Sequence, residues 1–275
     1  MKAVRPKVFL IGRSTIQHGE VRAWLNDIGA DQYHVEETVT SGEQLTQLAG
    51  KRCYMSFQPG LNPNIERVRT DMAEFITNIL NVGHGSVLEH VVYNFAIEHV
   101  SRVFTGEMNR HRAGMAISEG SMRFIRFDDI PWVQTEILRL ENYQGDGPGM
   151  EILREKIRMT IALFNAAFSQ DERNYRMFES IWADELAPTS SFKQKKTLTS
   201  LGRRIIGMGV ATGGVWSGNL RALRHIFTMR CDAAAEEEIL EVASLMLEKM
   251  REAEPLIFGD FHVVDGYWQP TYRGV

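Results

Sequence analysis

The first half of the chain mixes extended and helical patterns of apolar residues. Residues 7–12 form an apolar run that predicts a buried strand, and residues 20–25 fit a short helix. Two prolines and a glycine within residues 58–64 predict a loop. Between residues 91 and 104, β-branched and aromatic side chains in partial alternation favour a second strand.

Residues 65–80 carry the first long helical pattern. Their apolar side chains recur at a spacing of 3.6 residues, which predicts a helix packed on one face: Val68, Met72, Phe75, Ile76, Ile79 and Leu80. After a turn at residues 81–85, Ser86 and Glu89 have the spacing of a capping box, which would start another ordered segment.

Helical patterns dominate the second half. Residues 150–168 form a long amphipathic segment, preceded by a glycine-rich loop at residues 144–149. Residues 220–230 predict a shorter helix, and Asp232 is placed to cap a last helix that runs through Met250. Strands early in the chain and helices late in it together indicate an α+β fold.

Composition places the chain among ordinary globular proteins. It has 275 residues, of which 44% are hydrophobic and 24% charged, so it can bury a large core. Cys53 and Cys231 are too few for a disulfide scaffold, and we interpret both as buried, unreactive thiols of a reducing cytoplasm. No apolar stretch is long enough to span a bilayer, and the first residues lack the apolar core of a signal peptide.

Charge is unevenly distributed along the chain. The net charge is −4, yet residues 186–231 contain eight basic side chains and no acidic one, which leaves −12 for the rest. The basic segment is either a solvated surface or an anion site, most simply for phosphate. A basic surface of the kind that binds nucleic acid is absent from the sequence as a whole.

Candidate chemistry gathers between residues 107 and 124. Arg110, His111 and Arg112 are adjacent, so they would splay around a bound anion or a flat polar ring. Glu119, Ser121 and Arg123 alternate, which in an extended segment points all three side chains the same way. Such a group could bind a polar heterocycle and its phosphate, although an exposed strand with charged side chains explains the same pattern.

The segment around these residues resembles the signature of the flavin-dependent thymidylate synthases, the ThyX family. That signature has Arg-His-Arg, then seven residues, then Ser, within a pattern that ends Asn-Glu-x-Ser-x-Arg-Tyr. Here Arg110 to Arg112 match its start and Ser118 to Phe124 its end, but eight residues separate Arg112 from Ser121. Glu107 stands where the family has a Gln that contacts uracil.

Two further segments resemble the family in the expected order. Residues 83–90 (GHGSVLEH) are similar to its Gly-His-x-Thr/Ser-x-x-Glu-His segment, and residues 219–232 (NLRALRHIFTMRCD) to its Asn-x-Arg-Ser-x-x-His/Asn-Phe-x-x-x-Arg-x-Asp helix. The resemblance covers residues 65–262, with residues 1–60 as a mixed N-terminal extension of one domain. It implies long helices packed with a small antiparallel sheet.

The resemblance also assigns roles to residues. It implies a flavin near His84, Ser86, Glu89, Arg110, His111, Arg112, Ser118, Asn219 and His225. It implies a pyrimidine nucleotide held by Glu107, Glu119, Ser121, Arg123, Arg203 and Arg230, with Arg204 one residue from the family's register. Arg230, which would polarise the pyrimidine, and Ser121 are the expected catalytic residues.

The implied reaction is the reductive methylation of dUMP at C5 to give dTMP. Methylene-tetrahydrofolate would give the carbon, FAD would carry the hydride and NADPH would reduce the flavin, in a cytoplasmic homotetramer with sites at subunit interfaces. We expect neither a membrane nor a nucleic acid as partner, and no metal. Two alternatives stay open: a related enzyme that modifies another pyrimidine nucleotide such as UMP or a cytosine nucleotide, and a non-catalytic homologue that binds nucleotide or RNA.

Overall fold

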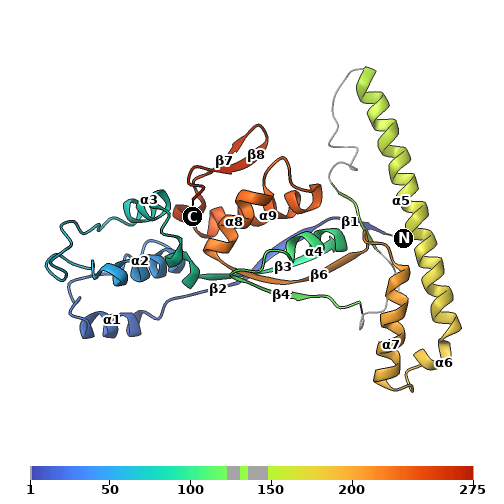
Figure 1. Ribbon diagram of the computed structural model, residues 1–275, viewed down its shortest axis with the longest axis horizontal. Helices are drawn as coiled ribbons and strands as arrows, with labels where there is room; N and C mark the ends of the chain where they lie inside the picture. Colours follow the sequence, from blue (N-terminus) through green and yellow to red (C-terminus); the bar gives the residue numbers. More distant parts are fainter. Residues whose placement is uncertain (1, 123–130, 136–147, 275) are drawn as a thin grey trace.

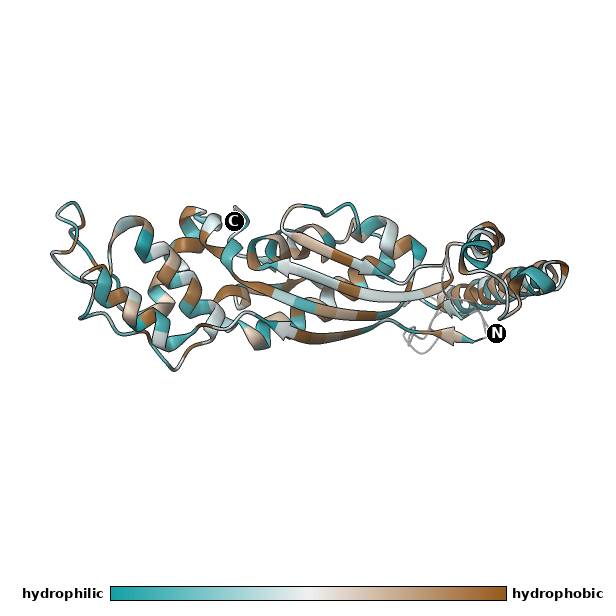
Figure 2. Ribbon diagram, turned by 90° about the horizontal axis from the view of Figure 1, so that it is seen from below, coloured by the Kyte–Doolittle hydropathy of each residue, from teal (hydrophilic) through white to brown (hydrophobic). Residues whose placement is uncertain are grey.

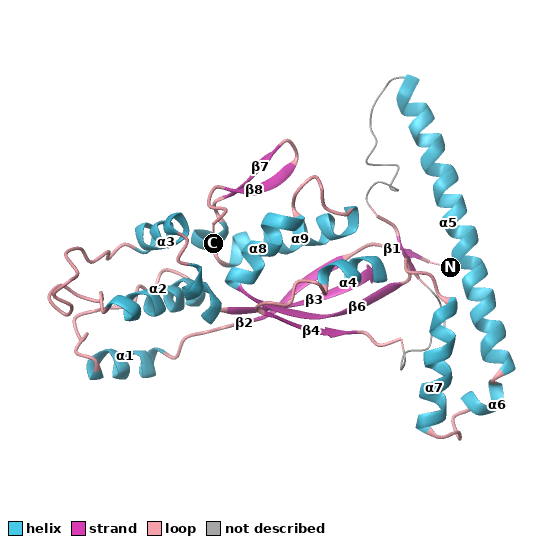
Figure 3. Ribbon diagram, viewed as in Figure 1, coloured by secondary structure: helices cyan, strands magenta, loops and turns pink. Residues whose placement is uncertain are grey.

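A four-stranded antiparallel sheet forms the centre of the molecule. The computed structural model describes residues 2–122, 131–135 and 148–274. The strands lie in the order β2, β3, β6 and β4, and their bounds are Lys7–Arg13, Val92–Ser101, Ala211–Asn219 and Met115–Glu119 (Figure 3). The strand predicted at 7–12 is confirmed, and the one predicted at 91–104 ends at residue 101. The mixture of helices with a small antiparallel sheet confirms the predicted fold class.

One face of this sheet carries the main core. Alternation along β3 buries Tyr93, Phe95 and Ile97 completely. Their face packs against α8 (Leu220–Arg230) and α9 (Glu237–Ala253), which lie on the same side of the sheet (Figure 1). The short helix α4 (Arg102–Met108) joins the same core and follows β3 directly.

Helices extend the molecule at both ends of the sheet, and Figures 1 and 2 show the elongated shape that results. At one end lie α1 (His18–Asp27), α2 (Ser41–Tyr54), α3 (Met72–Val82) and the 3₁₀ helix η1 (Gly85–His90). At the other lie α5 (Pro148–Ile181), α6 (Ala183–Leu186), α7 (Phe192–Gly202) and η4 (Arg203–Ile205).

Short elements complete the fold. The strands β1 (Ala3–Val4) and β5 (Trp132–Val133) pair in parallel. The chain then closes with α10 (Pro255–Phe258) and a hairpin of β7 (Phe261–Val264) and β8 (Tyr267–Pro270). Within the described ranges, no helix is both long and apolar enough to cross a bilayer.

The helices in the second half largely follow their patterns. The helix predicted at 220–230 has those bounds, and the one predicted at 150–168 continues to residue 181. Asp232 does not cap the last helix, because Glu236 accepts the backbone N–H groups of Glu238 and Ile239 instead. Of the loop predicted at 144–149, residues 144–147 lie outside the described residues.

Two predictions in the first half are wrong. The helix expected from residue 65 begins at Met72, where the Asp71 side chain accepts the backbone N–H of Glu74 at 2.6 Å. The carbonyl of Arg69 accepts a hydrogen bond from the buried Lys51 ammonium at 2.6 Å, which holds the preceding segment outside the helix. Ser86 and Glu89 do not form a capping box, since η1 starts without any side-chain cap.

The two cysteines differ in environment. Cys231 is buried as predicted, and burial raises the pKa of its thiol to about 12. Cys53 is exposed on α2, so the prediction that it is buried is wrong.

A buried carboxyl group joins the N-terminal helices to the sheet. Glu254 is completely buried and accepts hydrogen bonds from the hydroxyls of Thr40, which caps α2, and of Tyr93 on β3. Burial raises the pKa of Glu254 to about 7, and its hydrogen bonds with Thr40 and Tyr93 oppose that rise. The carboxyl group therefore connects α2, β3 and the end of α9 at one point.

A buried arginine anchors the C-terminal segment. Arg224 on α8 is 2% exposed and forms two contacts with the Asp260 carboxylate, at 2.7 and 3.0 Å. Its guanidinium also donates to the carbonyl oxygens of Ile257 and Tyr272. The basic segment 186–231 is therefore not a single anion-binding surface, because one of its arginines is a structural group of the core.

We predict that Asp260→Ala destabilises the protein by about 3–5 kcal/mol, because it leaves the Arg224 cation buried without its counter-ion. Urea unfolding would measure this loss. Glu155→Ala removes an exposed ion pair with Arg158 and should change the unfolding free energy by less than about 1 kcal/mol. Equal effects of the two substitutions would contradict this role of Arg224.

Candidate functional site

Two helices that follow neighbouring strands bring the first group of predicted residues together. Glu107 lies in the last turn of α4, and Arg230 is the last residue of α8. The Arg230 guanidinium contacts the Glu107 carboxylate at 3.2 Å and donates through Nε to Nε2 of His111 at 2.9 Å. Glu107 also pairs with Arg110 at 3.0 Å, and the His111 and His225 rings are 6.2 Å apart. We call these five residues the Arg230 cluster.

The hydrogen bond from Arg230 fixes the state of His111. Because the guanidinium is always a donor, Nε2 of His111 must be an acceptor, which assigns the ring proton to Nδ1. Burial, Arg230 and His225 lower the pKa of His111, while Glu107 opposes this shift. His111 is therefore neutral at pH 7 and braces Arg230 without adding charge.

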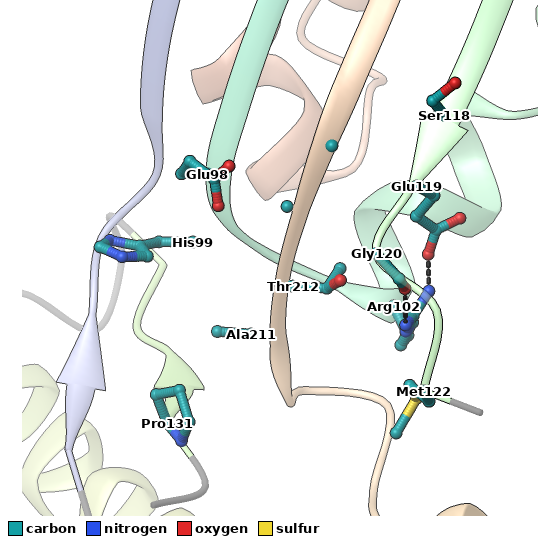
Figure 4. Close-up of a pocket in the computed structure, with 12 residues that line it drawn as sticks. Glu98, His99, Arg102, Ser118, Glu119, Gly120, Met122, Pro131, Ala211 and Thr212 are labelled. Atoms are coloured by element: carbon teal, nitrogen blue, oxygen red, sulfur yellow. Dashed lines mark hydrogen bonds and ion pairs between the residues drawn. The ribbon is translucent and has the colours of Figure 1, made fainter. Parts of the chain in front are cut away.

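A second group surrounds Glu119 at the end of β4. Figure 4 shows its carboxylate paired with Arg102, which also donates to the Gly120 carbonyl at 2.8 Å. The other oxygen of Glu119 accepts from the Asn109 amide at 3.0 Å. Glu119 was predicted to hold a sugar or an arginine, and the structure shows that it binds an arginine.

Two neighbouring pockets open beside this group. The sheet pocket, of about 490 Å³, is drawn in Figure 4 and is lined by residues of β3, β4 and β6 that include Glu98, His99, Ser118 and Thr212. The arginine pocket, of about 470 Å³, is lined by Arg102, Glu119, Gly120, Ser121, Met122, Arg203 and Arg204. Three arginines against one carboxylate make the second pocket suitable for an anion.

A third group lies on η1 and at the start of α8. The Glu89 carboxylate pairs with Arg221 at 2.5 Å, and the Arg221 side chain lies so close to Gly85 that a Cβ there would come within 2.8 Å of it. His84 stacks on Tyr54, with ring centroids 6.3 Å apart, and Ser86 is exposed.

Asn219 is committed to local structure. Its side-chain oxygen accepts the Ala222 backbone N–H at 2.8 Å and so caps α8. Gly114 follows Arg112 with a φ of +70°, and a Cβ on it would lie 2.6 Å from the Asn219 amide. Glycine therefore lets the chain after Arg112, which is exposed, pass directly over the start of α8.

The predicted site residues thus fall into three groups rather than one cavity of a single chain. Arg123 lies outside the described residues. Arg203 and Arg204 both line the arginine pocket, so the structure does not choose between them. Sequence reasoning missed Arg102, whose position directly after a buried strand was its only signal.

We predict that Arg230→Gln raises the pKa of His111 toward the ordinary value for histidine, because a neighbouring cation is removed. Titration of ¹³C-labelled histidine by NMR would measure it. In Arg158→Gln, an exposed change on α5, the His111 titration should stay as in the parent protein. An unchanged His111 pKa in Arg230→Gln would contradict the contact.

Comparisons with known proteins agree with the residues of these groups. A family model described as thymidylate synthase complementing protein (Thy1) matches residues 35–256. The flavin-dependent thymidylate synthase of Mycolicibacterium vanbaalenii is 30% identical over 81% of each chain, and that of Mycolicibacterium gilvum is 31% identical over 81% of this chain and 80% of its own.

A solved structure supports the fold. The UMP/dUMP methylase PolB of Streptomyces cacaoi, bound with 5-Br dUMP, superposes with a TM-score of 0.62 over 94% of this chain and 96% of its own, at 16% identity. The family match extends over most of the chain and contains all three groups of residues. The chain therefore belongs to the ThyX family of flavin-dependent thymidylate synthases, which are FAD-dependent methyltransferases.

Proposed function

We propose that the protein methylates dUMP at C5 to give dTMP, using methylene-tetrahydrofolate and NADPH with FAD as its cofactor. The observation that carries this proposal is the braced guanidinium of Arg230, held by Glu107 at one nitrogen and by His111 at another. Arg230 and His111 match the family's residues in two separate segments, and the fold brings them into contact.

A fixed cation is what activation of a pyrimidine ring requires. C5 is a poor nucleophile until negative charge that develops on the ring is stabilised. The Arg230 side chain is 18% exposed, so it reaches the surface from a partly dry environment where its charge acts strongly. Its Nε and Nη1 are already engaged, and Nη2 has no partner within the described part of the chain, which leaves it for a ligand.

The arginine pocket suits the phosphate of the nucleotide. Arg203 and Arg204 are exposed at its rim, and Ser121 offers a hydroxyl beside them. Arg102 brings a further guanidinium that Glu119 orients. We assign phosphate binding to these residues, together with Arg123.

The exposed donors of the other groups fit FAD. Arg110, whose side chain is 71% exposed, and Arg112 offer cations for a diphosphate, while His84 and His225 offer imidazole rings at the surface. Ser86, Glu89, Ser118 and Asn219 complete the proposed binding set. Bound FAD supplies hydride transfer, which amino-acid side chains cannot perform.

We further propose a homotetramer with sites at subunit interfaces. The three groups of site residues do not share one cavity, and α5 exposes large apolar side chains that an assembly would cover: Ile152, Met159, Leu163, Met177 and Ile181. Sedimentation equilibrium should give about four times the chain mass of 31.3 kDa. A fully active monomer would contradict this assembly.

UMP is a second candidate substrate. The solved relative PolB acts on UMP as well as dUMP by its description, and this chain has one extra residue before Ser121 in the segment assigned to the nucleotide. Measuring NADPH oxidation and methyl transfer with dUMP and with UMP in parallel separates the two.

We predict that Arg230→Ala retains bound FAD, with an unchanged visible spectrum, but forms dTMP at least about a hundredfold more slowly, because a preorganised charge is lost. Chromatographic detection of dTMP with dUMP, methylene-tetrahydrofolate and NADPH measures the rate. Arg158→Ala, on the exposed surface of α5, serves as the control and should retain full activity. Normal turnover by Arg230→Ala would overturn the assignment, and a parent protein that binds no flavin would overturn the proposed function.

A further inference from the structure

We propose that Glu107 makes the nucleotide site specific for uracil over cytosine. The proposal rests on the proposed function in one respect, namely that Arg230 holds the pyrimidine. It concerns the choice of base, which neither the family match nor the relatives' descriptions assign to a residue of this chain.

The contacts of Glu107 define what it can offer to a ligand. One carboxylate oxygen lies 3.0 Å from Nη1 of Arg110 and the other lies 3.2 Å from Nη1 of Arg230. The side chains of Glu107 and Arg230 are 23% and 18% exposed, so the pair reaches the surface together. A carboxylate that faces a guanidinium at each oxygen offers lone pairs and no proton.

The other group that contacts Arg230 cannot take this part. His111 directs the lone pair of its Nε2 at the guanidinium, so it has no acceptor left at that nitrogen. Glu107 therefore supplies the acceptor beside the free donors of Arg230. The surface presents an N–H donor next to a carboxylate acceptor.

This donor and acceptor pair matches one pyrimidine edge and opposes another. Uracil carries a carbonyl oxygen at C2 next to an N–H at N3, so an arginine and a carboxylate can satisfy both. Cytosine carries the same carbonyl next to an unprotonated N3, whose lone pair would face the lone pairs of Glu107. A buried or half-buried mismatch of this kind costs far more than a missing contact.

A glutamine at the same position would not discriminate in this way. Its amide has both an acceptor oxygen and a donor NH₂ group, so by turning over it can serve either base. ThyX proteins are expected to carry glutamine here, and this chain has glutamate. The substitution removes the donor option and fixes the choice.

The test compares nucleotide binding by the FAD-loaded protein and by Glu107→Gln. Isothermal titration calorimetry with dUMP, UMP and dCMP gives three dissociation constants for each. We expect the parent protein to prefer dUMP over dCMP by about a hundredfold or more, and Glu107→Gln to reduce this ratio at least about tenfold. The ratio of dUMP to UMP should stay the same, because Glu107 reads the base.

Two further variants control the test. Glu179→Gln removes a carboxylate that pairs with Arg176 at 3.0 Å on α5 and has nearly the same exposure, 22%, and it should leave every ratio unchanged. Glu107→Asp keeps an acceptor without a donor, so it should retain the preference for uracil even where overall affinity falls. The flavin spectrum of each variant reports whether the site is folded.

The outcomes separate the two proposals. A parent protein that binds dCMP as well as dUMP overturns the role of Glu107, whether or not Glu107→Gln folds. An unchanged ratio in Glu107→Gln overturns it as well. A parent protein that binds neither uracil nucleotide overturns the proposed function itself.

Discussion

The antiparallel pairing of β3 with β6 is the constraint from which the Arg230 cluster follows. The register runs from Val92 opposite Asn219 to Ser101 opposite Ala211, so each strand ends where the other begins. The helix after each strand returns over the same face, and α4 and α8 approach each other from opposite ends of the sheet. Glu107 and Arg230 meet there, although 123 positions separate them in the sequence.

The helix α4 also connects this cluster to the arginine pocket. Asn109, the residue that ends α4, donates its amide to Glu119 and accepts from the Trp216 indole at 3.2 Å. Arg102, the first residue of α4, pairs with the same carboxylate. One short helix therefore carries groups for both regions, and its packing through Phe104 against Trp216 sets their spacing. A shift of α4 would move both at once.

The sequence predicted those parts of the structure in which apolar periodicity or a motif spacing is decisive. The bounds of α8 follow from both, since Asn219 caps the helix that carries His225 and Arg230. The helix α2 was missed because it buries polar residues such as Gln44 and Lys51, which depend on partners elsewhere in the chain. Periodicity cannot show such partners.

The same limit applies to the site. Arg230 and His111 were found by motif, but their contact needs the strand register, and Arg102 becomes meaningful only when Glu119 faces it. Arg224 stands in a matched segment beside Arg221, yet one is buried with Asp260 and the other pairs with Glu89 at the surface. The helical angle between them, rather than residue type, decides which arginine serves the core.

The central strand β6 has a consequence for how this fold can change. Gly214 lies so close to β4 that a Cβ would be 2.4 Å from the Ser118 carbonyl, and one on Gly218 would be 2.6 Å from the Met115 sulfur. Adding a single methyl group at either position would push β4 outward and carry Glu119 with it. Residues without side chains, and without any contact to a ligand, thus limit substitution here as strictly as catalytic groups do. Variation in substrate choice must then come from the helices and loops around the sheet, while the strand beneath them stays as it is.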